Sequence, residues 1–117
     1  MKRITALLCL MSLFHFSSFA QTDFNLEPTQ SMLMTGKGPG QDATINPFKG
    51  EICYAIVENT GKISFSIRIQ QQGKIKQEIT IESGEIKKIK LLAEDELYLD
   101  PNPVGTTSAS VDYQKFK

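Results

Sequence analysis

Apolar and polar residues alternate along the second half of the chain with a period of two. The clearest run covers residues 63–70, where every second side chain is isoleucine or phenylalanine and the others are polar. Successive side chains of an extended strand point to opposite faces, so this alternation predicts a strand with one apolar face. The same criterion predicts strands at 75–81, where Gln77 interrupts the apolar face, and at 86–92. The remaining expected strands are 52–57, which is apolar on both faces and therefore central in a sheet, 97–99 and 109–113.

Glycines at 50, 61, 73 and 84 separate these runs at intervals of 11 or 12 residues. Turns at that interval are typical of a small antiparallel sandwich or barrel. No proline lies between Phe48 and Asp100, where it would remove hydrogen bonds between strands. We expect hairpin turns at 59–62, 72–74 and 82–85. No helix with an apolar stripe fits the chain after residue 20. The pattern therefore predicts an all-β protein, a small antiparallel β-sandwich of six to eight short strands.

The part of the chain before these strands has a different composition. Residues 21–30 are mostly polar, which predicts a flexible N-terminal arm, and a single β-sandwich domain is expected at 31–117. Within that domain, 31–34 is expected to form a first short strand. Residues 35–40 contain three glycines and a proline and predict a flexible loop. Residues 43–45 are expected to form another short strand.

Residues 1–20 have the pattern of a cleaved signal peptide. Lys2 and Arg3 precede an apolar run over 4–16, and Ser18 and Ala20 supply the small residues required for cleavage after Ala20. The apolar run is too short for a permanent membrane anchor, and no second run of membrane length follows it. We therefore expect a bacterial protein that is periplasmic or secreted and has no membrane span.

Cleavage after Ala20 removes much of the reactive chemistry of the chain. The only histidine, His15, lies in the signal peptide, so catalysis by an imidazole base and the usual zinc sites are excluded. Cys53 is the one cysteine that remains, and its apolar neighbours in the sequence predict a buried, inert thiol. We predict that the protein is not an enzyme. A small hydrolase that uses carboxylates alone is the remaining catalytic alternative.

Residues with side-chain oxygens gather near the end of the chain. They are Glu94, Asp95, Glu96, Asp100 and Asn102. Calcium prefers oxygen ligands, so a calcium site is one interpretation. The spacing is not that of an EF-hand, and the strand expected at 97–99 separates the two groups. We favour a solvated turn whose charges keep a strand edge from pairing with another chain, and we predict no cofactor.

Charge is unevenly distributed along the exported part of the chain. Residues 21–117 contain 11 basic and 13 acidic side chains, a balance that does not favour nucleic acid or an anionic membrane. Residues 62–90, however, contain seven basic and three acidic side chains. Several of the basic residues occupy outward positions on neighbouring expected strands, so we expect one shared basic sheet face; a purely solubilising surface is the alternative. The predicted binding residues are Arg68, Lys74, Lys76, Lys87, Lys88 and Lys90.

Two segments place a turn directly before an alternating strand. They are Val57-Glu58-Asn59-Thr60-Gly61 and Glu82-Ser83-Gly84-Glu85, the second leading into 86–91. In this respect residues 51–113 resemble the immunoglobulin-type β-sandwiches of bacterial envelope proteins. The resemblance implies an immunoglobulin-like fold without the Cys…Trp…Cys core of antibody domains. It implies no single function, because such folds carry many.

These patterns together predict a non-catalytic binding or accessory module of the bacterial envelope. The expected partner is a protein or an anionic glycan or other polymer, bound at the basic face by charge complementarity. The alternative is an inhibitor or immunity-type protein that blocks a secreted enzyme with the loop at 35–40 or the acidic segment 94–100. The oligomeric state is left open by the sequence.

Overall fold

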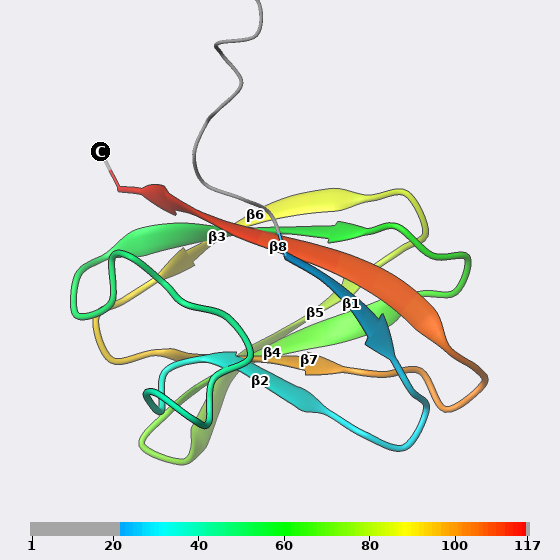
Figure 1. Cartoon of the computed structure of the whole chain (residues 1–117), viewed down its shortest axis with the longest axis horizontal. Helices are drawn as coiled ribbons and strands as arrows, with labels where there is room; N and C mark the ends of the chain where they lie inside the picture. The colour runs from blue at the N-terminus through cyan, green and yellow to red at the C-terminus, as the bar shows by residue number, and fades with distance from the viewer. Residues whose placement is uncertain (1–21, 117) are drawn as a thin grey trace, which may run out of the picture.

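Two layers of strands make up the computed structural model, which describes residues 22–116 (Figure 1). Eight strands form two antiparallel sheets of four strands each, and the predicted all-β sandwich is therefore confirmed. The strands are β1 (Thr22–Leu26), β2 (Met32–Thr35), β3 (Cys53–Asn59), β4 (Phe65–Gln71), β5 (Lys74–Ile81), β6 (Ile86–Leu91), β7 (Glu96–Asp100) and β8 (Thr107–Lys115). The described residues contain no helix long and apolar enough to cross a bilayer. The signal peptide predicted at 1–20 lies outside the described residues.

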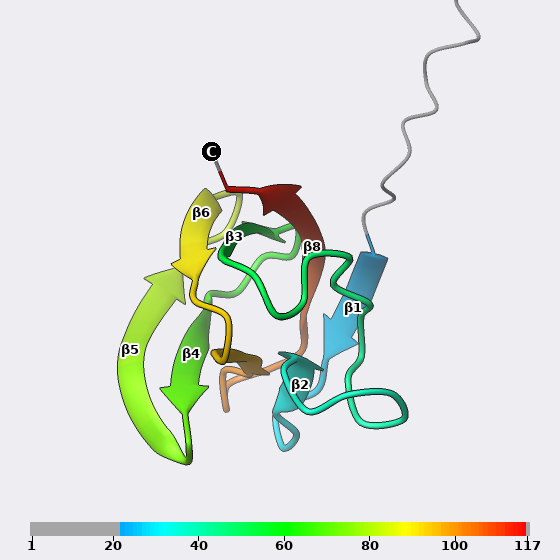
Figure 2. The ribbon, with the colours of Figure 1, turned by 90° about the vertical axis from the view of Figure 1, so that its left-hand side faces the viewer.

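The strand order identifies the topology. Sheet A has the order β1-β8-β3-β6, and sheet B has the order β2-β7-β4-β5. Apart from β4 and β5, consecutive strands lie in different sheets, so the chain crosses repeatedly between the layers (Figure 2). This nested arrangement is that of an eight-stranded jelly roll. An immunoglobulin sandwich instead pairs its first two strands in one sheet, so the immunoglobulin-like connectivity expected from the sequence is wrong.

The core lies between the two sheets and follows the predicted alternation. On β3 and β4 every second side chain is buried and those between are partly exposed. The largest buried side chains come from both layers, with Phe65, Ile67 and Leu97 of sheet B facing Val57 and Val111 of sheet A. The outer face of β3 is only half-buried, so this strand is central in its sheet but is not covered on both sides.

The N-terminal segment is part of the sandwich. Thr22–Leu26 forms β1, which pairs antiparallel with β8 from Thr22 opposite Val111 to Leu26 opposite Thr107. Leu26 is fully buried and Phe24 packs against the core. The expectation of a flexible arm at 21–30 is therefore wrong for 22–26, because two alternating apolar side chains are enough to hold this short strand on the sheet.

Of the two short strands expected at 31–34 and 43–45, the first is confirmed and the second is wrong. A strand at 31–34 is confirmed as β2. Residues 43–45 do not form a strand, although the amides of Ala43 and Thr44 donate to the carbonyls of Leu33 and Met34 at 2.9 and 3.0 Å. The backbone contact with β2 stays this short because the chain turns away at Pro47.

One of the three predicted hairpin turns is a hairpin. Gln72 and Gly73 join β4 to β5 with positive φ angles of 52° and 79°, as a tight two-residue turn requires. The turns at 59–62 and 82–85 instead carry the chain from one sheet to the other. At the first crossing the backbone of Gly61 lies against Thr107 and Ser108, and a Cβ atom at Gly61 would overlap them.

Asn59 stabilises this crossing by hydrogen bonds from its side chain. Its side chain is fully buried, and its amide nitrogen donates to the carbonyls of Ile63 and Ile81, both at 2.9 Å. Its amide oxygen accepts from the backbone nitrogen of Gly61 at 2.9 Å and from the hydroxyl of Thr107 at 3.3 Å. A single side chain thus joins the ends of β3, β5 and β8.

Candidate functional site

The basic residues expected to share one face lie on different sheets. Arg68 is on β4 and Lys74 and Lys76 are on β5, all in sheet B. Lys87, Lys88 and Lys90 are on β6, in sheet A. The predicted single basic face is therefore not formed, because β6 pairs with β3 rather than with β5.

Arg68 is committed to contacts within the protein. Its guanidinium donates to both carboxylate oxygens of Asp100 at 2.8 and 2.7 Å, donates to Gln70, and lies 4.2 Å from the centroid of the Tyr98 ring. Partial burial acts to raise the pKa of Asp100, but hydrogen bonds from Arg68 and Ser31 outweigh it and lower the pKa. Arg68 therefore braces β4 against β7.

Lys76 lies at an irregularity in β5 and forms an ion pair with Asp95. The register passes from Gln77 opposite Ile69 to Ile75 opposite Gln70, which leaves Lys76 as an extra residue without a partner on β4. The Lys76 ammonium lies 2.7 Å from the carboxylate of Asp95, a residue only 6% exposed. The same bulge turns Ile75 outward, where it is 55% exposed.

The acidic segment 94–100 is only partly the solvated turn that the sequence predicts. Asp95 is buried and accepts a hydrogen bond from the backbone nitrogen of Leu92 at 2.8 Å, in addition to its ion pair with Lys76. Glu96 pairs with Lys37 at 3.3 Å, and Asp100 is held by Arg68. Among the described residues, no three His, Cys, Asp or Glu side chains are grouped so that they can hold a metal ion.

Lys88 and Lys90 form an exposed cluster with two aromatic rings on the outer face of sheet A. The Lys88 ammonium lies 4.5 Å from the centroid of the Tyr54 ring, and the Lys90 ammonium lies 4.8 Å from that of Phe116. The two ring centroids are 5.5 Å apart. We call Tyr54, Lys88, Lys90 and Phe116 the cationic-aromatic patch. Lys87 lies outside it, since Lys87 is paired across the strands with the core residue Val57 and forms an ion pair with Glu85 at 3.6 Å.

The sequence contained only part of the information that locates this patch. Tyr54 occupies alternate positions with Cys53 and Ala55, which are buried, so its outward direction follows from strand periodicity. Phe116 follows the last strand and carries no local signal that places its ring beside Tyr54. The patch exists because β6, β3 and β8 are neighbours in sheet A.

The glycine-rich segment expected to be flexible is hydrogen-bonded to Asp42. The Asp42 carboxylate accepts from the backbone nitrogens of Gly36, Lys37 and Gly38 at 3.0, 2.9 and 3.0 Å. Partial burial acts to raise the pKa of Asp42, but these three hydrogen bonds and the charge of Lys49 lower it. Loop 36–52 is therefore anchored at its base, and it lies across one end of the sandwich (Figure 1).

The hydroxyl of Thr44 attaches this loop to both sheets, through Met34 of β2 and Tyr113 of β8. Thr44 is buried, and its hydroxyl donates to the carbonyl of Met34 at 2.8 Å and is hydrogen-bonded to the hydroxyl of Tyr113. The next residue, Ile45, is 89% exposed. Ile45 borders a hollow of about 560 Å³ whose other lining residues are Gly38, Pro39, Gly40, Asp42, Ala43, Thr44, Asn46 and Lys49.

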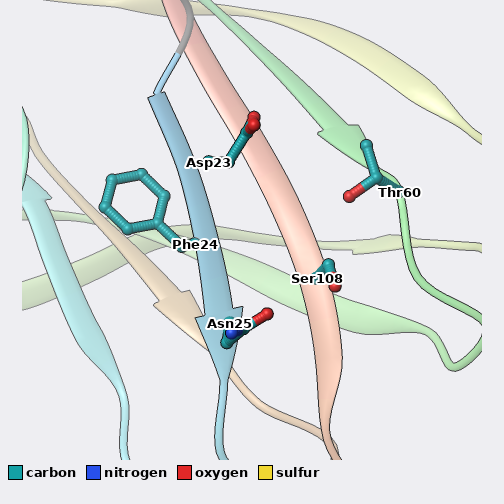
Figure 3. Close-up of a pocket in the computed structure, with 5 residues that line it drawn as sticks. All are labelled: Asp23, Phe24, Asn25, Thr60 and Ser108. Carbon is teal, nitrogen blue, oxygen red and sulfur yellow. The ribbon is translucent and has the colours of Figure 1, made fainter.

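A second hollow, of about 310 Å³, lies on the outer face of sheet A away from the patch (Figure 3). Asp23 and Asn25 of β1, Ser108 of β8 and Thr60 after β3 surround it. Phe24 also lines it, but its ring points to the other side of β1. None of these residues was a sequence candidate, although Asp23 and Asn25 alternate with the apolar Phe24 and Leu26, which is the signal that places them on one face.

No protein-family model and no curated protein sequence matches this chain. A solved structure with a similar fold is the crystal structure of PirA, with a TM-score of 0.58 and 13% sequence identity. The match covers 87% of this chain and 99% of the PirA chain. At this identity the likeness shows a shared fold and nothing about shared function.

Proposed function

We propose that the protein is an exported, non-catalytic binding module of the bacterial envelope that recognises an anionic polymer through the cationic-aromatic patch. The observation that carries this proposal is the placement of two lysine ammonium groups over two neighbouring aromatic rings on an open sheet face. The export part of the proposal rests on residues 1–20, which the structure does not describe.

The arrangement of the patch favours binding of anions. Each ring face holds an ammonium group at the surface by cation–π attraction, which limits the side-chain entropy that an incoming anion has to remove. The ammonium hydrogens that point away from the ring remain available as donors to a carboxylate or sulfate. Lys88 and Lys90 lie two residues apart on one strand, so their charges repeat along β6 at a spacing of roughly 7 Å. A repeating anionic polymer can engage both.

A binding role without catalysis agrees with the remaining reactive groups. Cys53 is 1% exposed, and burial raises the pKa of its thiol, which therefore stays protonated and unreactive at neutral pH. The carboxylates of Asp95 and Asp100, which a histidine-free hydrolase would need, are engaged in ion pairs. These features support the proposal that the chain binds its target and does not transform it.

The double charge reversal Lys88→Glu with Lys90→Glu is expected to weaken binding to dextran sulfate or polygalacturonate at least about tenfold, or roughly 1.4 kcal/mol. Binding of the unaltered protein is expected to weaken as salt rises, since exposed charges are screened. Affinity is measured by biolayer interferometry at two salt concentrations. The matched control is Lys62→Glu with Lys74→Glu, which makes the same change in net charge at two exposed lysines outside the patch. Equal losses in the two double variants, or no loss in the first, contradict the proposal.

A second candidate function, inhibition of a secreted enzyme, is favoured by one observation. Ile45 is almost fully exposed on a loop that Asp42 and Thr44 hold in place, and an exposed apolar anchor on a pre-organised loop suits insertion into an enzyme cleft. On this candidate, Ile45→Asp is expected to weaken a one-to-one complex with a secreted hydrolase at least about tenfold, whereas the patch double variant leaves it unchanged. Isothermal titration against a panel of secreted hydrolases measures both, and unchanged affinity of the Ile45 variant rejects this candidate.

A further inference from the structure

The hollow on the outer face of sheet A lies over the first part of β8. Ser108 of β8 lines the hollow with its short side chain. Asp23 and Asn25 line it from β1, where Asn25 stands opposite Ser108. On the other side Glu58 is paired with Ser110, and the backbone nitrogen of Thr60 donates to the carbonyl of Ser108 at 3.0 Å. We call this hollow, which Asp23, Asn25, Thr60 and Ser108 surround, the trough (Figure 3).

The polar side chains of this trough do not contribute hydrogen bonds to the fold. The side chains of Asp23, Asn25, Thr60 and Ser108 make no hydrogen bond to another described residue. These exposed or partly exposed side chains therefore remain available as donors and acceptors to a ligand held in the trough.

The charges around the trough restrict the ligand class. Asp23 and Glu58 are carboxylates, and the cations Lys88 and Lys90 lie at the far end of the sheet, opposite Ile56 and Tyr54. An anionic ligand would be repelled here. A metal ion is not favoured either, because no three candidate ligands are grouped among the described residues. The trough therefore suits a neutral ligand.

The donors and acceptors restrict it further. A carboxylate accepts from two hydroxyls, an amide both donates and accepts, and each serine or threonine hydroxyl does either. This set complements a molecule that carries several adjacent hydroxyl groups. A volume of about 310 Å³ is at the lower end of the range for small-molecule sites and leaves room for one sugar ring.

We propose that this trough binds one residue of a neutral saccharide. On one side the carboxylate of Asp23 accepts hydrogen bonds from the sugar hydroxyls, and the side-chain amide of Asn25 donates and accepts them. On the other side the hydroxyls of Thr60 and Ser108 donate or accept. The ring of Phe24 points away from the other four lining residues, so it does not stack on a ligand held between them. Affinity then depends on hydrogen bonds at an open surface, which places the dissociation constant in the range of about 1–20 mM. The inference is independent of the cationic-aromatic patch, whose Tyr54 row lies six residues along β8 from Ser108, or roughly 20 Å.

The test is a titration of the purified, ¹⁵N-labelled protein with the methyl glycosides of glucose, galactose, mannose and N-acetylglucosamine, each up to about 50 mM. At least one of them is expected to produce saturable shifts of the backbone amides of Asn25, Thr60 and Ser108, with those of Tyr54 and Lys88 unchanged. Asn25→Ala and Thr60→Val are each expected to weaken that binding at least about fivefold. The matched control Gln114→Ala, on the same face but outside the trough, leaves it unchanged.

Several results overturn the inference. These are the absence of saturable shifts with all four glycosides, shifts that Asn25→Ala does not reduce, and shifts of the same amides by calcium chloride alone or by glucuronate alone. Urea denaturation of each variant keeps the test interpretable, because the exposed Asn25 and Thr60 contribute little to folding and both variants are expected to unfold like the unaltered protein. The patch variant with Lys88→Glu and Lys90→Glu is expected to bind the glycoside normally, so failure of either proposal is recognised separately.

Discussion

Asn59→Ala is expected to lower the free energy of unfolding by about 3–4 kcal/mol. The variant removes the donor to the carbonyl of Ile81 and the acceptor for the amide of Gly61, and both groups are left in the interior at the point where β3, β5 and β8 meet. It also leaves a space that the surrounding strands fill only in part. Urea denaturation followed by circular dichroism measures the change.

Asn102→Ala is the control for this prediction. The Asn102 side chain accepts from the backbone nitrogen of Val104 at 2.9 Å in an exposed turn and donates to the hydroxyl of Ser64 at 3.3 Å. Water replaces such contacts, so a loss below about 1 kcal/mol is expected. If Asn59→Ala destabilises the protein no more than Asn102→Ala does, the crossing is not held by the buried amide.

Stability is expected to fall by about 2–3 kcal/mol between pH 10 and pH 12 because of Tyr113. Burial is the main cause that raises the pKa of Tyr113 to about 12, against 10.0 for an unperturbed tyrosine. In this interval the phenol of the unfolded chain has lost its proton while that of the folded chain keeps it. The unfolded state therefore gains stability as the pH rises, and folding weakens until the folded pKa is passed.

Tyr113→Phe is expected to remove most of this alkaline loss. The buried hydroxyl of Thr44 keeps its bond to the carbonyl of Met34, so the variant remains folded at pH 7. Burial also raises the pKa of the Cys53 thiol, which adds a smaller loss of the same sign that persists in the variant. Unfolding free energies at pH 8, 10 and 12 check the prediction, and an unchanged slope in Tyr113→Phe would show that the phenol titrates alike in both states.

Strand positions were predictable because alternation records which side chains face the core. The run at 63–70 became β4 with Phe65, Ile67 and Ile69 buried, as the pattern predicted. The short β1 was missed because only Phe24 and Leu26 are apolar there, too few to stand out from a polar segment. Its stability comes from pairing with β8, about 85 residues later in the chain, and local sequence does not record such a partner.

The sheet to which a strand belongs was not predictable from the same pattern. Lys76 and Lys88 both lie on strands with outward polar positions, and adjacent strands in sequence usually pair. The turn at 82–85 instead carries the chain across to the other layer, which places β5 and β6 in different sheets. Alternation defines inside and outside for each strand, but it does not distinguish a hairpin from a crossing. Because this one turn is a crossing, the predicted basic face does not form.

The binding trough and the cationic-aromatic patch depend on the same long-range pairings. Asp23 meets Ser108 and Ser110 only because β1 lies beside β8, and Lys90 meets Phe116 only because β6 and β8 flank β3. The residue types were visible in the sequence. Their grouping required the strand order.

The place of β8 in sheet A sets when this protein can fold. β8 is formed by residues 107–115, and among the eight described strands it is the sole partner of β1 and one of the two partners of β3. A chain that lacks these last residues therefore has no partner for its first strand and no centre for one of its two layers. During synthesis, sheet A therefore cannot close until residues 107–115 have emerged and can pair with β1 and β3. The order of strands thus delays formation of this layer until β8 is available.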